Sequence, residues 1–284
     1  MKKILLFALA VASFAACTEP LPEKVDEFLV SEDFHASLQA ESRTELDGTS
    51  VLWCEDDQLT IFTKTAHNRQ YKLKSLTDDR RTATFGYVGY TGNNSSAIQA
   101  NYALYPYNAD ATINGDVIST KLDFYQAHST DKIDISAGLM VAKSQDNNLA
   151  FTNACALLRI NISKSELVPE SYTLNWIGLT SAAHKLSGDV TIDLAADCKA
   201  IVAPDGDNEV RLININREIT TEVQSFYITV PAASYEQGDI TVYLFGIGEF
   251  SLPALELKAG YITSISYTIK DTSEDFTGSF PSGR

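Results

Sequence analysis

Residues 226–244, FYITVPAASYEQGDITVYL, contain two short runs in which apolar and polar side chains alternate. Phe, Ile and Val occupy every second position of 226–230, and Ile, Val and Leu do so in 240–244. Successive side chains of a strand point to opposite faces, so this period of two predicts strands with one buried face. Proline and a Gly-Asp pair separate the runs, as residues that end strands do.

The same alternation recurs along the chain from Phe28 to about residue 270. Further runs are 34–38, 59–61, 101–105, 151–157, 172–176, 190–192, 210–213 and 261–265. They are short and bounded by Gly, Asn, Asp and Pro, and no long stretch carries a helical stripe. The sequence therefore predicts an all-β protein.

The number of strands sets the predicted domain organisation. A dozen or more short strands exceed what one small sandwich holds, and the polar segment 163–171, SKSELVPES, interrupts them. We expect two tandem β-sandwich domains, at residues 28–163 and 164–270, followed by a polar tail at 271–284.

The first seventeen residues, MKKILLFALAVASFAAC, have the pattern of an export signal. Two lysines precede an apolar run that is too short to cross a bilayer as a helix. The end of the run resembles a bacterial lipobox, so residues 1–16 are the expected signal peptide and Cys17 the expected lipid-bearing residue. An ordinary secretory signal with an incidental cysteine is the alternative. The acidic, proline-containing stretch 17–27 is the expected linker.

Composition and charge indicate the class of protein and one kind of partner that it does not suit. The 284 residues are 44 % hydrophobic and 21 % charged, which is typical of a globular chain. Loss of Lys2 and Lys3 with the signal takes the formal charge from −15 to −17, which disfavours nucleic acid as a partner.

Besides Cys17, three cysteines remain without CxxC spacing. We expect Cys54 and Cys155 to be small buried hydrophobes, with a bridge between them as the alternative.

A search for enzyme chemistry yields no catalytic residue. The four histidines lie in unrelated contexts, and the sequence has neither HExxH nor GxSxG. Residues 205–209, DGDNE, offer oxygen ligands for calcium but lack the length of an EF-hand loop, so a solvated turn is expected. The adjacent Asp56 and Asp57 would point to opposite faces of a strand. We predict neither a metal nor a cofactor, and no enzyme.

Residues 43–62, RTELDGTSVLWCEDDQLTIF, resemble the opening of a Bacteroidales fimbrillin, a subunit of type V pili. The shared features are an Arg-Thr pair at 43–44, a glycine turn at 48, Val51, Trp53 and an acidic stretch leading into a strand. Further matches are 104–107 (LYPY), 151–158 (FTNACALL) and 258–261 (KAGY). Each also has a structural interpretation: Gly48 fits a hairpin turn, and Trp53, Tyr105 and Tyr107 are expected to pack in the core.

The resemblance implies a fold and a mode of assembly. The fold would be two transthyretin-like, Greek-key sandwiches in a lipoprotein precursor at the outer membrane. A trypsin-like surface protease would cut after an arginine or lysine, release the first strand and open a groove for a strand of the next subunit. The matching strand carries Phe34, Ala36 and Leu38, and the matching cut lies between Arg43 and Thr44.

The resemblance leaves other interpretations open. Arg43 has acidic neighbours, Glu41 and Glu45, and is alternatively a surface residue of an uncut hairpin. The tail contains Gly and Pro, which weaken a donor strand, so a tip or accessory position in the fimbria is expected. The alternative function is a surface lipoprotein that does not polymerise: a pilus anchor or a glycan- or protein-binding protein. An enzyme acting on surface glycans is a third.

Overall fold

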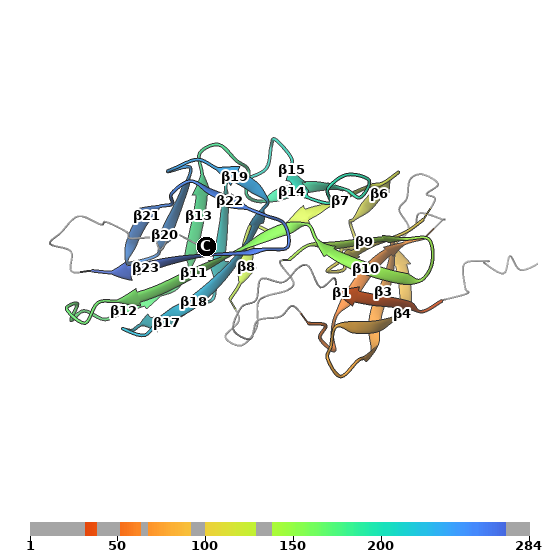
Figure 1. Ribbon diagram of the computed structural model, residues 1–284, viewed down its shortest axis with the longest axis horizontal. Coiled ribbons are helices and arrows are strands. Elements are labelled where there is room, and N and C mark those ends of the chain that lie inside the picture. The colour runs from red at the N-terminus through yellow and green to blue at the C-terminus, as the bar shows by residue number, and fades with distance from the viewer. Residues whose placement is uncertain (1–31, 39–51, 64–67, 92–99, 129–137, 271–284) are drawn as a thin grey trace, which may run out of the picture. The chain divides into compact units, whose positions relative to one another are not determined.

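The computed structural model describes residues 32–38, 52–63, 68–91, 100–128 and 138–270, and every regular element in them is a strand (Figure 1). The prediction of an all-β fold is confirmed. Within these ranges no helix has the length and apolar character needed to cross a membrane.

Seven strands form a closed sheet. In spatial order they are β1 (Phe34–Leu38), β10 (Asn148–Asn153), β9 (Met140–Ser144), β5 (Asn101–Tyr105), β2 (Gln58–Phe62), β3 (Asn68–Leu76) and β4 (Thr82–Thr91). Pairing of β1 with both β4 and β10 closes the sheet, so a strand from the start of the chain completes the ring.

The remaining strands form a five-stranded, a four-stranded, a three-stranded and two two-stranded sheets. The five-stranded sheet is β21 (Gly248–Ser251), β20 (Ile240–Leu244), β13 (Ile177–Ser181), β16 (Glu209–Ile213) and β8 (Tyr125–Ala127). The four-stranded sheet is β15 (Ala200–Val202), β14 (Gly188–Asp193), β7 (Val117–Leu122) and β6 (Thr112–Asn114). The three-stranded sheet is β18 (Gln224–Pro231), β11 (Cys155–Lys164) and β23 (Ile262–Ile269). The small sheets pair β12 (Tyr172–Leu174) with β17 (Arg217–Ile219), and β19 (Ala233–Tyr235) with β22 (Leu255–Leu257).

Strands β2, β5 and β9 of the closed sheet are buried on both faces. In β5, Ala103 and Tyr105 point into the closed sheet, whereas Tyr102 and Leu104 join a second cluster with side chains of β6, β7 and β14. The alternation of side chains across a strand produces this division. The four-stranded sheet therefore packs against the outside of the closed sheet at these strands.

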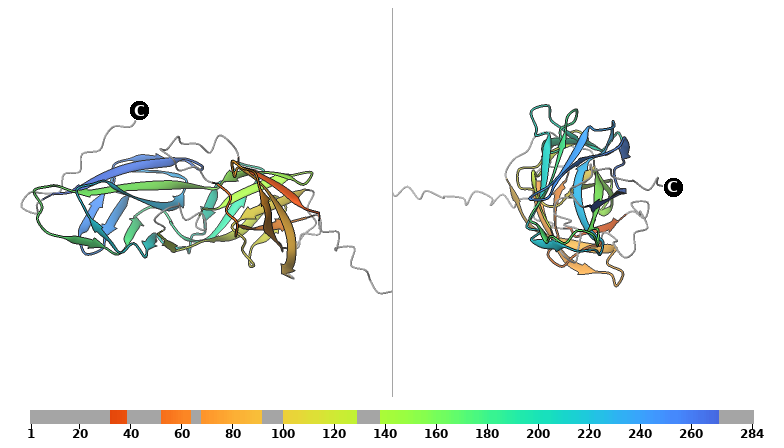
Figure 2. Two further views of the ribbon diagram at one scale, coloured as in Figure 1. Left: turned by 90° about the horizontal axis from the view of Figure 1, so that it is seen from below. Right: turned by 90° about the vertical axis from the view of Figure 1, so that its left-hand side faces the viewer.

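A third apolar cluster lies under the three-stranded and five-stranded sheets. Every second residue of β11, from Ala156 to Ile162, points into it, and the residues between them are polar from Arg159 onward. Strand β11 runs parallel to β23 and antiparallel to β18. Figure 2 shows the blue β23 alongside the green β11.

Strands β7 and β8 link the sequence on the two sides of residue 163. Strand β7 pairs with β14 and β8 pairs with β16, so residues 117–127 share sheets with residues 188–213. The described residues belong to one compact unit. The domain boundary between residues 163 and 164 stays a prediction.

Cys155 begins β11 and is buried, as expected. It forms no disulfide, so a bridge to Cys54 is excluded, and Cys54 is half-buried. Burial raises the pKa of the Cys155 thiol to about 12. At pH 8 this thiol is protonated and therefore a poor nucleophile.

We predict that iodoacetamide at pH 8 modifies Cys155 more slowly than the half-buried Cys198 in the native chain. In urea the two should react at similar rates, because the burial that suppresses the Cys155 thiolate is lost. Peptide mass mapping after timed quenching measures both rates. Equal rates in the native chain would show that Cys155 is accessible.

Candidate functional site

Strand β1 and the groove that it occupies form the candidate site. Residues 34–37 pair antiparallel with residues 82–85 of β4, and residues 35–38 pair parallel with residues 148–151 of β10. At the ends of the strand, the His35 amide donates to the Asn147 carbonyl over 2.8 Å and the Leu38 amide to the Arg81 carbonyl over 3.1 Å. Backbone pairing on both sides therefore holds β1 in place.

The side chains of β1 alternate between the core and the surface. Phe34 and Ala36 are buried, Leu38 is half-buried, and all three belong to or pack on the cluster inside the closed sheet. On the other face, Nδ1 of His35 lies 3.2 Å from the Thr84 hydroxyl. The strand predicted at 34–38 is confirmed with its bounds.

Trp53 forms the floor of this groove. Its ring makes edge contacts with Phe85, Tyr105 and Phe151, at centroid distances of 5.2, 5.5 and 5.4 Å. Phe85 lies opposite Phe34 on β4, and Phe151 lies opposite Leu38 on β10. One tryptophan thus contacts both flanks of the strand, and its predicted role as a core anchor is confirmed.

Backbone and side-chain hydrogen bonds fix the turn that carries Trp53. The Trp53 amide donates to the Arg80 carbonyl over 3.0 Å, and Nε of Arg80 donates back to the Trp53 carbonyl over 2.8 Å. Asp57 accepts from the Cys54 amide at 2.7 Å and from the Tyr105 hydroxyl at 2.9 Å. Asp57, from the acidic stretch, and Tyr105, from the LYPY segment, therefore both help to position Trp53.

The residues before β1 make polar contacts at the surface. Lys74 Nζ lies 2.8 Å from Asp33 Oδ1, and the Asn147 amide group donates to Glu32 over 2.8 Å. Such exposed pairs each contribute about 0–1 kcal/mol. The strand is thus held mainly by its ladders and its apolar side chains.

Removal of β1 would leave a groove suited to another strand. Strands β4 and β10 would each expose unpaired backbone N–H and C=O groups, with Phe85, Phe151 and Trp53 between them. Exposed edges of this kind capture extended segments readily. An incoming strand would need apolar side chains at alternate positions, as β1 has.

Three predicted site residues, Cys17, Arg43 and Thr44, lie outside the described residues. Phe34, Ala36 and Leu38 lie within β1, but displacement of that strand stays a prediction.

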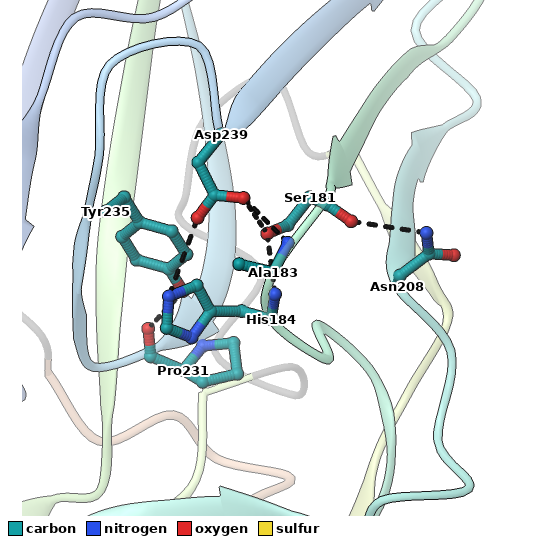
Figure 3. A network of polar contacts seen from close by, with 7 residues as sticks. All are labelled: Ser181, Ala183, His184, Asn208, Pro231, Tyr235 and Asp239. Carbon is teal, nitrogen blue, oxygen red and sulfur yellow. Dashed lines mark hydrogen bonds and ion pairs between the residues drawn. The ribbon is translucent and has the colours of Figure 1, made fainter.

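A Ser-His-Asp group that sequence reasoning missed joins the ends of β13 and β20 (Figure 3). The buried Asp239 carboxylate accepts from the Ser181 hydroxyl and the Ala183 amide, both over 2.8 Å. His184 Nε2 lies 3.5 Å from its other oxygen, and the His184 amide donates to the Ser181 hydroxyl over 2.9 Å.

This group does not have the order of a catalytic triad. In a triad the histidine ring bridges the nucleophile and the carboxylate. Here the carboxylate lies between the hydroxyl and the ring, so the histidine does not activate the serine. Burial, followed by the Asp239 charge, raises the pKa of the adjacent Tyr235, which keeps its hydroxyl neutral and donating to the Pro231 carbonyl. The network thus holds the loop that follows β13 to the loop that precedes β20.

The described residues contain no group of three or more His, Cys, Asp or Glu side chains that could hold a metal ion. The solvated turn expected at 205–209 is confirmed only in part. Asp205 and Gly206 lie in the turn between β15 and β16, whereas Asp207 forms an isolated bridge with Ser187 and Glu209 begins β16.

No protein-family profile and no curated protein matches this chain. A solved structure from Bacteroides ovatus, of a protein described as a candidate for cell adhesion, matches 87 % of this chain and 95 % of its own, at 14 % identity and a TM-score of 0.54. A protein of the same description from Bacteroides uniformis matches 86 % and 94 %, at 17 % identity and a TM-score of 0.47. The fimbrial anchor protein of Porphyromonas gingivalis matches 84 % and 90 %, at 10 % identity and a TM-score of 0.38.

The likeness to the Bacteroides ovatus protein establishes a shared fold. That protein comes from the Bacteroidales and has a cell-adhesion description, so the shared fold agrees with the resemblance that the motifs indicated.

We predict that Trp53→Ala lowers the free energy of unfolding by about 3–5 kcal/mol, because it removes a fully buried ring from the groove floor. Tyr261→Ala, which changes a ring that is 45 % exposed, is the matched control and should shift it by about 0.5 kcal/mol or less. Urea unfolding followed by circular dichroism measures both. Similar losses in the two variants would contradict the placement of Trp53.

Proposed function

We propose that this chain is a structural and adhesive subunit of a cell-surface fimbria, assembled by release of β1 and insertion of a strand from another subunit. The observation that carries the proposal is the two-sided pairing of β1 over a preformed aromatic floor. The fold shared with a Bacteroides protein described as a candidate for cell adhesion supports a role at the cell surface.

In the proposed mechanism, a protease cuts between Arg43 and Thr44, and β1 leaves with the segment that precedes the cut. The vacated groove then accepts a strand whose apolar side chains replace those of Phe34, Ala36 and Leu38. Each large buried side chain contributes about 1.5–3 kcal/mol and each ladder hydrogen bond about 0.5–1.5 kcal/mol. A donor of about ten residues thus gains on the order of 10 kcal/mol, enough to join subunits without a covalent link.

The proposal extends to the precursor. The chain would be exported, carry a lipid on Cys17 and stand at the outer membrane until it is cut. Its folded part would consist of two tandem sandwiches with transthyretin-like, Greek-key topology, with the boundary near residue 163. Its partners would be other fimbrial subunits and a ligand on a host or bacterial surface.

Within the fimbria we place this subunit at the tip or in an accessory position. The tail KDTSEDFTGSFPSGR, residues 270–284, has two phenylalanines but is interrupted by acidic residues, Gly and Pro, which suit a donor strand poorly. Strand β23 is a poor donor as well, because it pairs along its length with β11.

The acidic neighbours of Arg43 favour a second candidate function. Glu41 and Glu45 disfavour binding to a protease that recognises a basic residue. If no cut occurs, β1 stays in its groove and the chain is a lipoprotein that does not polymerise, either a pilus anchor or a ligand-binding surface protein.

We predict that Arg43→Ala abolishes the ladder of polymers seen on mild, unheated gels, because an uncut β1 excludes a donor strand. Arg43→Lys, which keeps a residue that such a protease accepts, is the matched control and should preserve the ladder. Undiminished polymers from Arg43→Ala would show that the cut lies elsewhere or is not needed.

Deletion of residues 271–284 tests the position of the subunit within the fimbria, with the same gel assay. The tip or accessory assignment predicts unchanged incorporation into fimbriae. Loss of polymers would identify the tail as a donor and the chain as a stalk subunit.

We predict that Cys17→Ser leaves the precursor without lipid, because the diacylglycerol is attached to that thiol. Partitioning between detergent and aqueous phases measures the change, and the wild-type precursor should enter the detergent phase. A variant that enters it equally would contradict the assignment of Cys17.

A further inference from the structure

One residue from each strand of the five-stranded sheet contributes to a single transverse row. The row runs from Glu249 on β21 through Tyr243, Gly178 and Arg211 to Tyr125 on β8. The apolar residues that alternate with it along β13, β16 and β20 belong to the core. Alternation therefore turns the row toward the outer face of the sheet.

Aromatic rings and one guanidinium group form a continuous stack across this face. Trp176 stacks on Phe245 at a centroid distance of 5.0 Å and an angle of 23°. The Arg211 guanidinium lies 4.8 Å from the Trp176 ring and 5.4 Å from the Phe124 ring, and Phe124 meets Tyr125 edge-on at 4.7 Å. We call these five residues the outer stack.

Gly178 makes room for the outer stack. A Cβ at this position would lie 2.9 Å from Cζ3 of Trp176 and 3.7 Å from Cε3. The shorter of these distances is less than real Cβ atoms show, so a larger residue would push the indole away. The edge of the indole therefore rests on the backbone of β13, while Phe245 and Arg211 lie over the ring.

The ends of the outer stack are open to solvent. Phe245 is 49 % exposed and Tyr125 is 58 % exposed. Arg211 is already paired with Glu209 through Nε, and its pKa is raised first by that hydrogen bond. Glu249 at the end of the row is exposed and has no ion-pair partner among the described residues. The charge on this face that is left without a counterion is therefore negative.

These features fit a protein partner that carries positive charge. Trp, Tyr and Arg are the side chains enriched among the residues that dominate binding energy at protein interfaces. A cation placed over the open ring of Phe245 would repeat the contact that Arg211 makes with Trp176 and Phe124. The formal charge of the chain, −15, attracts such a partner and repels a second copy of this chain.

We propose that the outer stack is a docking surface for a segment of a partner protein that bears arginine or lysine side chains. The inference names the kind of partner for the adhesive role and rests on that role for its biological setting. Binding itself needs no strand release, so it can be measured on the unpolymerised chain and fails independently of the proposed assembly.

The test uses two synthetic Gly-Ser peptides, one with three arginines and the other with three glutamines at the same positions. Spectra of the ¹⁵N-labelled chain contain two indole signals, from Trp176 in the outer stack and from Trp53 in the groove floor. The arginine peptide should shift the Trp176 signal and leave the Trp53 signal in place, and the glutamine peptide should shift neither.

Variants at the open ends of the outer stack locate the contact. Phe245→Ala and Tyr125→Ala should each weaken binding of the arginine peptide about three- to tenfold, the range expected for loss of one cation–π contact. Glu249→Gln should reduce the salt dependence of binding. Tyr261→Ala removes a similarly exposed ring elsewhere and should leave the affinity unchanged, and the Trp53 signal reports that each variant is folded.

Three results would overturn the proposal. The first is equal affinity in wild type and in a Phe245→Ala/Tyr125→Ala double variant, and the second is an equal response to the glutamine peptide. The third is a shift of the Trp176 signal by a neutral glucose pentasaccharide but not by the arginine peptide, which would identify a glycan site instead.

Discussion

Closure of the seven-stranded sheet by β1 is the constraint on which the first half of the structure depends. The strand pairs with β4 and β10 at once, and Trp53 beneath it contacts Phe85 and Phe151 from both flanks. A closed sheet has no free edge, so the seated strand removes the sites at which other chains could add. Its departure would therefore expose two strand edges and the aromatic floor between them at the same time.

Strand β1 buries fewer apolar side chains than the longer strands do. Only Phe34 and Ala36 of β1 are buried completely, whereas β11 buries an apolar side chain at every second position from Ala156 to Ile162. Strands β2, β5 and β9 also pack against the four-stranded sheet through their outer faces. Loss of β1 would remove side chains from the inner cluster, whereas the second cluster contains no residue of β1.

Local features were predictable from the sequence, and pairing partners were not. Alternation of apolar residues located β1 with its bounds, and the size of Trp53 indicated a core position. Neither feature shows that β1 runs parallel to β10, or that β7 and β8 pair with strands that follow residue 163. A period of two identifies the buried face of a strand but not the strand beside it. The outer stack was hidden for the same reason, since only the register of β8, β13 and β16 brings Tyr125, Trp176 and Arg211 together.

The groove and the outer stack rest on different parts of the core. The cluster under the five-stranded sheet contains no residue of the closed sheet, and the cluster under β1 contains no residue of the five-stranded sheet. Release of β1 therefore disturbs packing that the outer stack does not use. The core residues beneath the outer stack are therefore the same whether β1 occupies its groove or not, so the shape of the outer stack does not depend on that strand.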